Sequence, residues 1–164
     1  MARNNILIIL VLVLLFIVMT RNSGYATTTP LITSVQKTQM NQILKTAPTN
    51  IRLIPSYNRL KTVFKILSNA TVTTSSIPEP YRTEFQAVLA NFQTSISLFI
   101  ERYASYKTSP CDYITFLYKA IYNELMRLNM VVRNFNDPGM TQVSILSTIT
   151  NKPLQAEYDL GCFY

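Results

Sequence analysis

The two cysteines, Cys111 and Cys162, are the residues whose chemistry the sequence shows most directly. A disulfide bond between them would join the start of a predicted helix to the C-terminal tail. It would close a loop of about 50 residues and stabilise the fold by about 4 kcal/mol, because the unfolded chain loses entropy. It would also require an oxidising compartment. We predict this bond; the alternative is two free thiols, because an unpaired cysteine packs as a small apolar side chain.

Acid–base catalysis has few candidate residues in this sequence. There is no histidine, so the commonest general base and nitrogen ligand for metals are missing. No glycine-rich phosphate loop, serine nucleophile motif or zinc-binding cysteine spacing is present. The carboxylates of Glu84, Glu101 and Glu124 could face one another on predicted helices, but solvation or pairing with nearby arginines explains them more simply. We therefore predict a protein that is not an enzyme and that has no cofactor and no metal site.

Basic side chains are concentrated before residue 79. Residues 21–78 contain seven Lys and Arg residues and no acid, while the whole chain has a net charge of +7. Such a one-sided distribution indicates an anionic neighbour, for example lipid headgroups. The side chains that we predict to contact this anionic surface are Lys37, Lys45, Arg59, Lys61 and Lys65.

Nucleic acid is the other anionic partner to consider. Arg59, Lys61 and Lys65 could bind phosphates while Tyr57 and Phe64 stack on bases. Both aromatic residues, however, already belong to the apolar stripe of a predicted helix, and no three basic residues are consecutive. A face that lies against anionic lipid explains the charges more simply, so we do not expect nucleic acid as a partner.

Three tyrosines, Tyr106, Tyr118 and Tyr122, lie close to the corner between the two longest predicted helices. Tyr118 and Tyr122 stand beside the main apolar stripe of their helix. Because tyrosine is enriched in protein–protein interfaces, we predict that these side chains contribute to a surface for other protein subunits, whose identity the sequence does not reveal. The alternative is ordinary core packing.

The most apolar part of the chain is its N-terminus, where residues 6–19 are fourteen consecutive apolar side chains. The uncharged stretch between Arg3 and Arg21 would form a helix about 25 Å long, short for a bilayer core of about 30 Å. We predict a single-pass signal-anchor helix over 1–20, followed by a polar linker over 21–30. The alternative is a signal peptide cleaved after Ala26, because small residues stand at the positions that cleavage requires.

Charge does not fix the orientation of this helix, because basic residues flank it on both sides. Asn69-Ala70-Thr71 is a consensus site for N-glycosylation, and such sites are used only on the luminal or extracellular side. Asn69 is therefore our candidate glycosylation site, and it favours an extracytosolic location for the C-terminal domain.

The remainder of the chain, residues 31–164, is predicted to form one helical domain with a basic first half. Three glycines are few for a protein rich in strands and turns. Apolar residues recur at helical spacing in four segments and in a short fifth one, which are 33–46, 55–68, 81–103, 110–135 and 140–150.

Proline and capping residues indicate where these helices begin. Pro55 suits the first position of the second helix, and Ser109 followed by Pro110 suits the start of the fourth. The apolar face of the first helix would contain Val35, with Gln39 as its polar exception. A short loop joins the third and fourth helices, so we expect them to form an antiparallel hairpin, while residues 69–77 form a polar loop.

These features predict an all-α protein with an N-terminal transmembrane helix followed by a four- to five-helix bundle. We expect a non-enzymatic, membrane-anchored structural or interaction protein, whose partners are the lipid membrane and other protein subunits. One such role is that of a virion membrane or minor capsid component, which links a lipid membrane to a protein shell. The alternative is a secreted helical ligand or effector, released by cleavage after Ala26.

Overall fold

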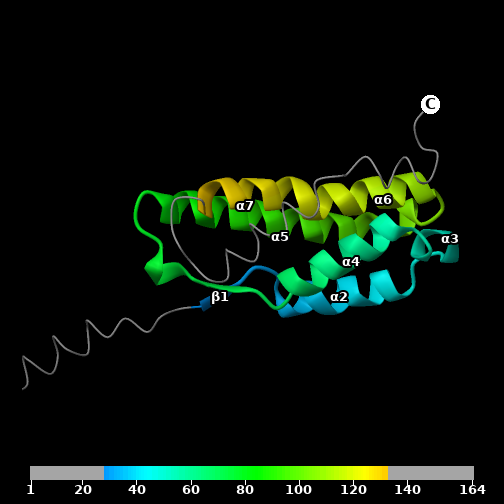
Figure 1. The fold of residues 1–164 in the computed structure, drawn as a ribbon, viewed down its shortest axis with the longest axis horizontal. Coiled ribbons are helices and arrows are strands. Elements are labelled where there is room, and N and C mark those ends of the chain that lie inside the picture. The colour runs from blue at the N-terminus through cyan, green and yellow to red at the C-terminus, as the bar shows by residue number, and fades with distance from the viewer. Residues whose placement is uncertain (1–27, 133–164) are drawn as a thin grey trace, which may run out of the picture.

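The computed structural model describes residues 28–132. The predictions for the membrane segment 1–20, the helix 140–150 and Cys162 lie outside these residues. Within them the chain is mostly helical, which confirms the predicted bundle (Figure 1). In chain order the elements are β1 Thr28–Pro30, α2 Ser34–Lys45, α3 Thr49–Arg52, α4 Pro55–Leu67, β2 Thr71–Thr73, a 3-10 turn Thr74–Ser76, α5 Tyr81–Tyr106, α6 Pro110–Tyr118, a π-helical turn Lys119–Asn123 and α7 Glu124–Val132.

The helix α2 begins with a complete capping box. The Thr33 hydroxyl accepts a hydrogen bond from the Gln36 backbone N–H at 3.3 Å, and the Gln36 side chain accepts one from the Thr33 backbone N–H at 3.2 Å. Two N–H groups at the open end of the helix are thereby satisfied. The predicted limits of this helix agree with the observed ones to within one residue.

The buried face of α2 differs from the predicted one. Val35 is 64% exposed and Gln39 is also exposed, whereas Gln36 is buried. The Gln36 side-chain amide donates to the backbone carbonyl of Gln93 at 2.6 Å and to the Ser97 hydroxyl at 2.8 Å, both on α5. Because a buried amide is tolerated when its polar atoms are paired, Gln36 and not Val35 faces the core.

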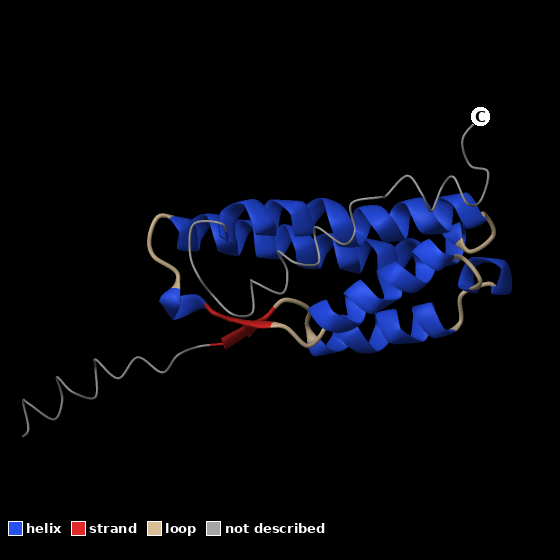
Figure 2. Cartoon of the chain, viewed as in Figure 1, coloured by secondary structure: helices blue, strands red, loops and turns tan. Residues whose placement is uncertain are grey.

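Two short strands form an antiparallel sheet, which corrects the prediction of a purely α-helical domain (Figure 2). Thr29 of β1 pairs with Val72 of β2, and Pro30 pairs with Thr71. We expected a polar linker at 21–30 and a loop at 69–77. Both strands are rich in β-branched residues, which favour extended backbone. Their pairing, however, joins distant parts of the chain, so no pattern in the local sequence predicts it.

The helix α5 and the segment after Ser109 form the predicted antiparallel hairpin. The Ser109 hydroxyl caps α6 by accepting a hydrogen bond from the Asp112 backbone N–H at 3.3 Å, and Pro110 is the first helical residue. The second arm is not the single α-helix that we predicted, because the π-helical turn Lys119–Asn123 separates α6 from α7. Such turns are frequent at functional sites.

The shorter helices pack against the hairpin. α2 contacts α5, while α3 and α4 contact α6. Figure 1 shows α2 and α4 lying beside the part of the hairpin that is nearer to its connecting loop. The interior is one apolar cluster, in which the largest fully buried side chains include Tyr57, Phe64, Phe85, Phe92 and Tyr113.

Two tyrosines lie where α4, α5 and α6 meet. The rings of Tyr57 and Tyr113 have centroids 6.4 Å apart, and the Tyr113 ring also meets Phe99 edge-on at 5.7 Å. The Tyr57 hydroxyl donates to the backbone carbonyl of Leu44, one of the last carbonyls of α2, which lacks a partner within its own helix. Burial raises the pKa of both tyrosines above the usual 10.0, so both hydroxyls stay protonated.

We expect the two hydroxyl groups to contribute unequally to stability. Tyr57→Phe should lower the free energy of unfolding by about 1–3 kcal/mol, because it leaves the Leu44 carbonyl without its donor. Tyr113→Phe should cost less, because the buried Tyr113 hydroxyl has no hydrogen bond of normal length among residues 28–132, although the Tyr57 hydroxyl lies near it. Urea unfolding of the two variants measures the difference, and equal losses would contradict it.

Candidate functional site: a basic face and a helical groove

Three of the five predicted anion-contacting residues gather at one place. Lys61 and Lys65 are exposed and lie four residues apart, so they share one side of α4. The Lys37 ammonium group donates to the side-chain carbonyl of Asn69 at 2.7 Å, and the Asn69 amide donates to the backbone carbonyl of Lys65 at 3.0 Å. We call Lys37, Lys61 and Lys65 the basic face, which lies where α2 begins and α4 ends.

The other two predicted residues lie elsewhere. Lys45 is at the far end of α2, about 12 Å along the helix from Lys37. Arg59 precedes Lys61 by two residues and therefore points to a different side of α4. The ion pairs within the described residues are Arg82 with Glu79 and Arg127 with Glu124, so no acid there pairs with the basic face.

The strand β1 brings the N-terminal part of the chain to the basic face. Pro30 pairs with Thr71, two residues after Asn69, and the Leu31 backbone N–H donates to the Ala70 carbonyl at 3.1 Å. In Figure 1 the strand lies next to the beginning of α2. The chain therefore enters the described domain beside Lys37 and Lys65.

Asn69 is exposed, as a glycosylation site must be. Its side chain links Lys37 to the end of α4 through the two hydrogen bonds described above. Its use as an attachment site for a glycan stays a prediction.

The three predicted interface tyrosines do not form one surface. The Tyr106 ring stacks on Phe116 with centroids 4.1 Å apart, whereas Tyr118 stacks on Tyr122 at 4.7 Å. Phe116 and Tyr118 are two residues apart and so face different sides of the helix. Tyr122 is only 9% exposed. A partner surface at these tyrosines stays a prediction, to which the structure adds a second aromatic residue, Phe116, beside Tyr106.

The pair Tyr106 and Phe116 stands at one end of a groove of about 260 Å³ between the two arms of the hairpin. The α5 side of this groove carries Ser95, Leu98, Arg102 and Tyr106. Ser95 is two residues from both Gln93 and Ser97, which accept the hydrogen bonds from the Gln36 side chain of α2. Because residues two apart face different sides of a helix, the groove opens on a side of α5 that α2 does not cover.

The second side of the groove follows the π-helical turn. It carries Phe116, Lys119, Ala120, Asn123 and Glu124. The Lys119 ammonium group lies 5.5 Å from the centroid of the Phe116 ring, within the range of a cation–π contact. Sequence reasoning missed this groove, because it depends on the register between two antiparallel helices.

Two of the three glutamates considered for catalysis are far apart, and the third is paired with an arginine. Glu84 and Glu101 are exposed and lie on one helix about 25 Å apart. Glu124 is in the other arm, where its carboxylate meets the Arg127 guanidinium at 3.5 Å. Glu84 and Glu101 are therefore too far apart to act together on one bond of a substrate, and the Glu124 carboxylate is paired with Arg127.

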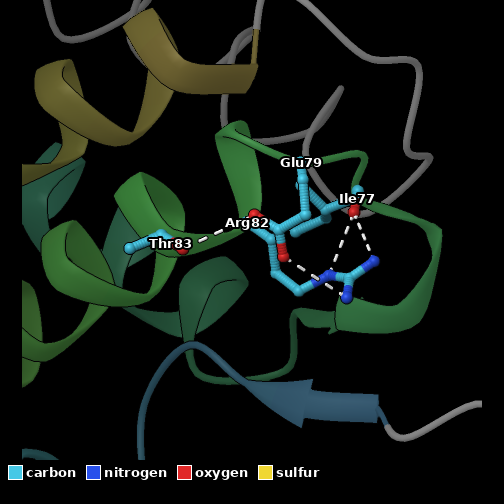
Figure 3. Close-up of polar contacts among 4 residues, drawn as sticks. All are labelled: Ile77, Glu79, Arg82 and Thr83. Carbon is cyan, nitrogen blue, oxygen red and sulfur yellow. Dashed lines mark hydrogen bonds and ion pairs between the residues drawn. The ribbon is translucent and has the colours of Figure 1, made fainter.

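Another group of polar contacts lies at the start of α5 (Figure 3). The Arg82 guanidinium donates twice to the Ile77 carbonyl, at 3.0 and 3.1 Å, and lies 3.4 Å from a Glu79 carboxylate oxygen. The Thr83 hydroxyl donates to the other oxygen of Glu79 at 3.5 Å. These contacts fix the loop that precedes the helix.

Cys111 forms a disulfide bond. Cys162 is the only other cysteine of the sequence and lies outside residues 28–132. The pairing of these two cysteines therefore stays a prediction.

Within the described part of the chain, no helix is both long and apolar enough to cross a membrane. In the same residues, no group of three or more His, Cys, Asp or Glu side chains is arranged to hold a metal ion. Comparison with known protein families, with curated proteins and with solved structures gives no match.

Proposed function

We propose that this protein is a non-enzymatic, membrane-anchored structural or interaction protein that links a lipid membrane to a protein layer, as a virion membrane or minor capsid component does. One observation carries the proposal: the basic face lies beside β1, the point at which the chain arrives from the apolar segment 6–19.

Chain length and charge support contact between the basic face and lipid. Residues 20–27 span at most about 27 Å when fully extended, so a membrane helix ending near residue 20 keeps β1 close to the bilayer. A lysine near an anionic bilayer contributes about 1 kcal/mol of attraction, which decays over a Debye length of about 10 Å. The three lysines of the basic face suit this role, because no acid among residues 28–132 forms an ion pair with them.

The other end of the hairpin supports contact with protein. The loop between α5 and α6 lies at the opposite end of the domain from β1 (Figure 1). Tyr106 and Phe116 flank this loop, and Phe116 is 37% exposed. With lipid at the β1 end, this arrangement points the aromatic end of the hairpin away from the membrane and toward a protein partner.

We expect charge reversal of the basic face to detach the domain from anionic lipid. The full chain is reconstituted in nanodiscs containing phosphatidylserine, with a dye at Asn58, which is exposed and lies one turn before Lys61. In low salt, a quencher on the lipid headgroups should reduce the dye emission. Replacing Lys37, Lys61 and Lys65 by glutamate should lower the docking equilibrium constant about 100-fold, since three attractions of about 1 kcal/mol are lost.

The matched control changes the same number of charges outside the basic face, at Lys45, Arg52 and Arg59. This control should keep at least a third of the quenching. Equal loss in both variants would mean that only net charge matters, and no quenching in the unchanged protein would exclude the lipid contact.

The alternative is a secreted ligand released by cleavage after Ala26. The intact mass of the protein from its native source distinguishes the two functions. A mass that includes residues 1–26 agrees with the anchor, whereas a chain that begins at Thr27 would replace the proposed function by the secreted one.

A further inference from the structure

We propose that the groove between α5 and the α6–α7 arm binds an acidic amphipathic helix of another protein. This inference rests on the proposed function, because it names the chemistry of the protein partner.

The apolar part of the groove is exposed and held in place. Leu98 is 43% exposed and Phe116 is 37% exposed. Phe116 has Tyr106 stacked on it at 4.1 Å and the Lys119 ammonium group 5.5 Å from its ring centroid. A side chain that is already fixed loses little entropy on binding, and aromatic residues are frequent hot spots of interfaces. Phe116 and Leu98 are thus suited to receive apolar side chains of a partner.

Two cationic side chains, Arg102 and Lys119, line the groove next to this apolar surface. The contact of Tyr106 with Phe116 sets the register of the antiparallel arms. One turn further along, about 6 Å away, this register places Arg102 of α5 opposite Lys119 and Ala120. Within residues 28–132 neither Arg102 nor Lys119 forms an ion pair with a carboxylate. Carboxylates of the partner can therefore pair with Arg102 and Lys119 in this part of the groove.

Glu124 defines the other end of the groove. Its side chain is only 13% exposed; one carboxylate oxygen meets Arg127, and the other is buried and has no hydrogen-bond partner in the described region. Because both oxygens of Glu124 are paired or buried, the partner helix places its acidic side chains toward Arg102 and Lys119, and an apolar side chain over Phe116.

The shape of the groove favours a helix over other ligands. One face of each of two antiparallel helices lines it, which forms a channel along the hairpin. An amphipathic helix places apolar residues three and four positions apart on one side and fits such a channel. Acidic residues in its first turns are also favourable for the helix itself.

The test uses a defined probe and the full chain in nanodiscs of neutral lipid. The probe is a labelled helical peptide of roughly four turns, with leucines on one face and glutamates elsewhere. One comparison peptide has lysine in place of glutamate, and another has the same composition in scrambled order. Fluorescence anisotropy, corrected with empty nanodiscs, should show the acidic amphipathic peptide binding at least tenfold more tightly than either comparison peptide.

Charge reversal of groove residues then tests whether the peptide binds in the groove. Arg102→Glu with Lys119→Glu should weaken binding of the acidic peptide at least tenfold, and Phe116→Ala at least fivefold. The matched control, Lys45→Glu with Arg59→Glu, makes the same change of net charge away from the groove and should weaken binding less than twofold. Circular dichroism of each variant checks that the fold is intact.

Four results would overturn the inference. The first is equal binding of the acidic and scrambled peptides, and the second is equal losses in the two charge-reversal variants. The third is peptide binding only after Glu157 and Asp159 are changed to lysine. The fourth is a change of oligomeric mass on charge reversal of the groove. The third would assign the groove to the C-terminal segment of this chain, and the fourth to a second copy. Failure of the lipid quenching experiment, with peptide binding retained, would remove only the lipid part of the proposed function.

Discussion

Replacing Phe92 by alanine is expected to lower the free energy of unfolding by about 3–5 kcal/mol. Phe92 lies near the middle of α5 and is 0% exposed. Its helix packs more extensively against α7 than against any other element among residues 28–132. Truncation of the ring removes apolar area from the core and leaves a cavity that the surrounding elements can fill only in part. Urea unfolding of the full chain in detergent, followed by the near-ultraviolet circular dichroism of its tyrosines, measures the change.

Leu98→Ala is the matched control for Phe92→Ala. Leu98 lies on the same helix but is 43% exposed, so its truncation should change the free energy of unfolding by no more than about 0.5 kcal/mol. A loss below about 1 kcal/mol for Phe92→Ala, or equal losses for the two variants, would contradict the buried position of Phe92.

Cys111→Ser is expected to lower stability by about 4 kcal/mol in non-reducing conditions, because a loop of about 50 residues is no longer closed in the unfolded chain. The loss should disappear when the unchanged protein and the variant are compared in excess reducing agent. Thermal unfolding with and without the reducing agent measures both quantities.

The pairing of Cys111 with Cys162 is tested by replacing Cys162. Cys162→Ser should destabilise as much as Cys111→Ser, and the double variant no more than either single one. A covalent dimer on a non-reducing gel that Cys111→Ser removes would show instead that the bond joins two chains.

The helices with strong local signals were predicted well from the sequence. α4 begins at Pro55, and α6 begins after the Ser109 cap, as expected, because capping and proline geometry act within a few residues. The face of α2 was wrong because Gln36 is paired by groups on α5. The strands were missed for the same reason, since the partner of β1 is distant in the sequence.

The π-helical turn left a sequence signal that could have been used. Leu117, Ile121 and Leu125 are all fully buried and follow one another in two steps of four residues. An α-helix has 3.6 residues per turn, so residues spaced four apart would gradually turn away from the core-facing side of a regular helix. The turn Lys119–Asn123 contains the wider i to i+5 hydrogen bonding and absorbs this drift. The groove beside it could not be predicted, because it also requires the register of α5.

The pairing of β1 with β2 determines how the domain responds to mechanical force. Tension on the chain before Thr28 enters the domain through β1 and acts along the strand, so the hydrogen bonds to β2 are loaded together in shear and not opened one by one. Behind the strand, Leu31 and Ile32 are 0% and 2% exposed, and the Gln93 amide donates to the Pro30 carbonyl at 3.3 Å. The domain can therefore bear a pull at its N-terminus before any helix has to unfold.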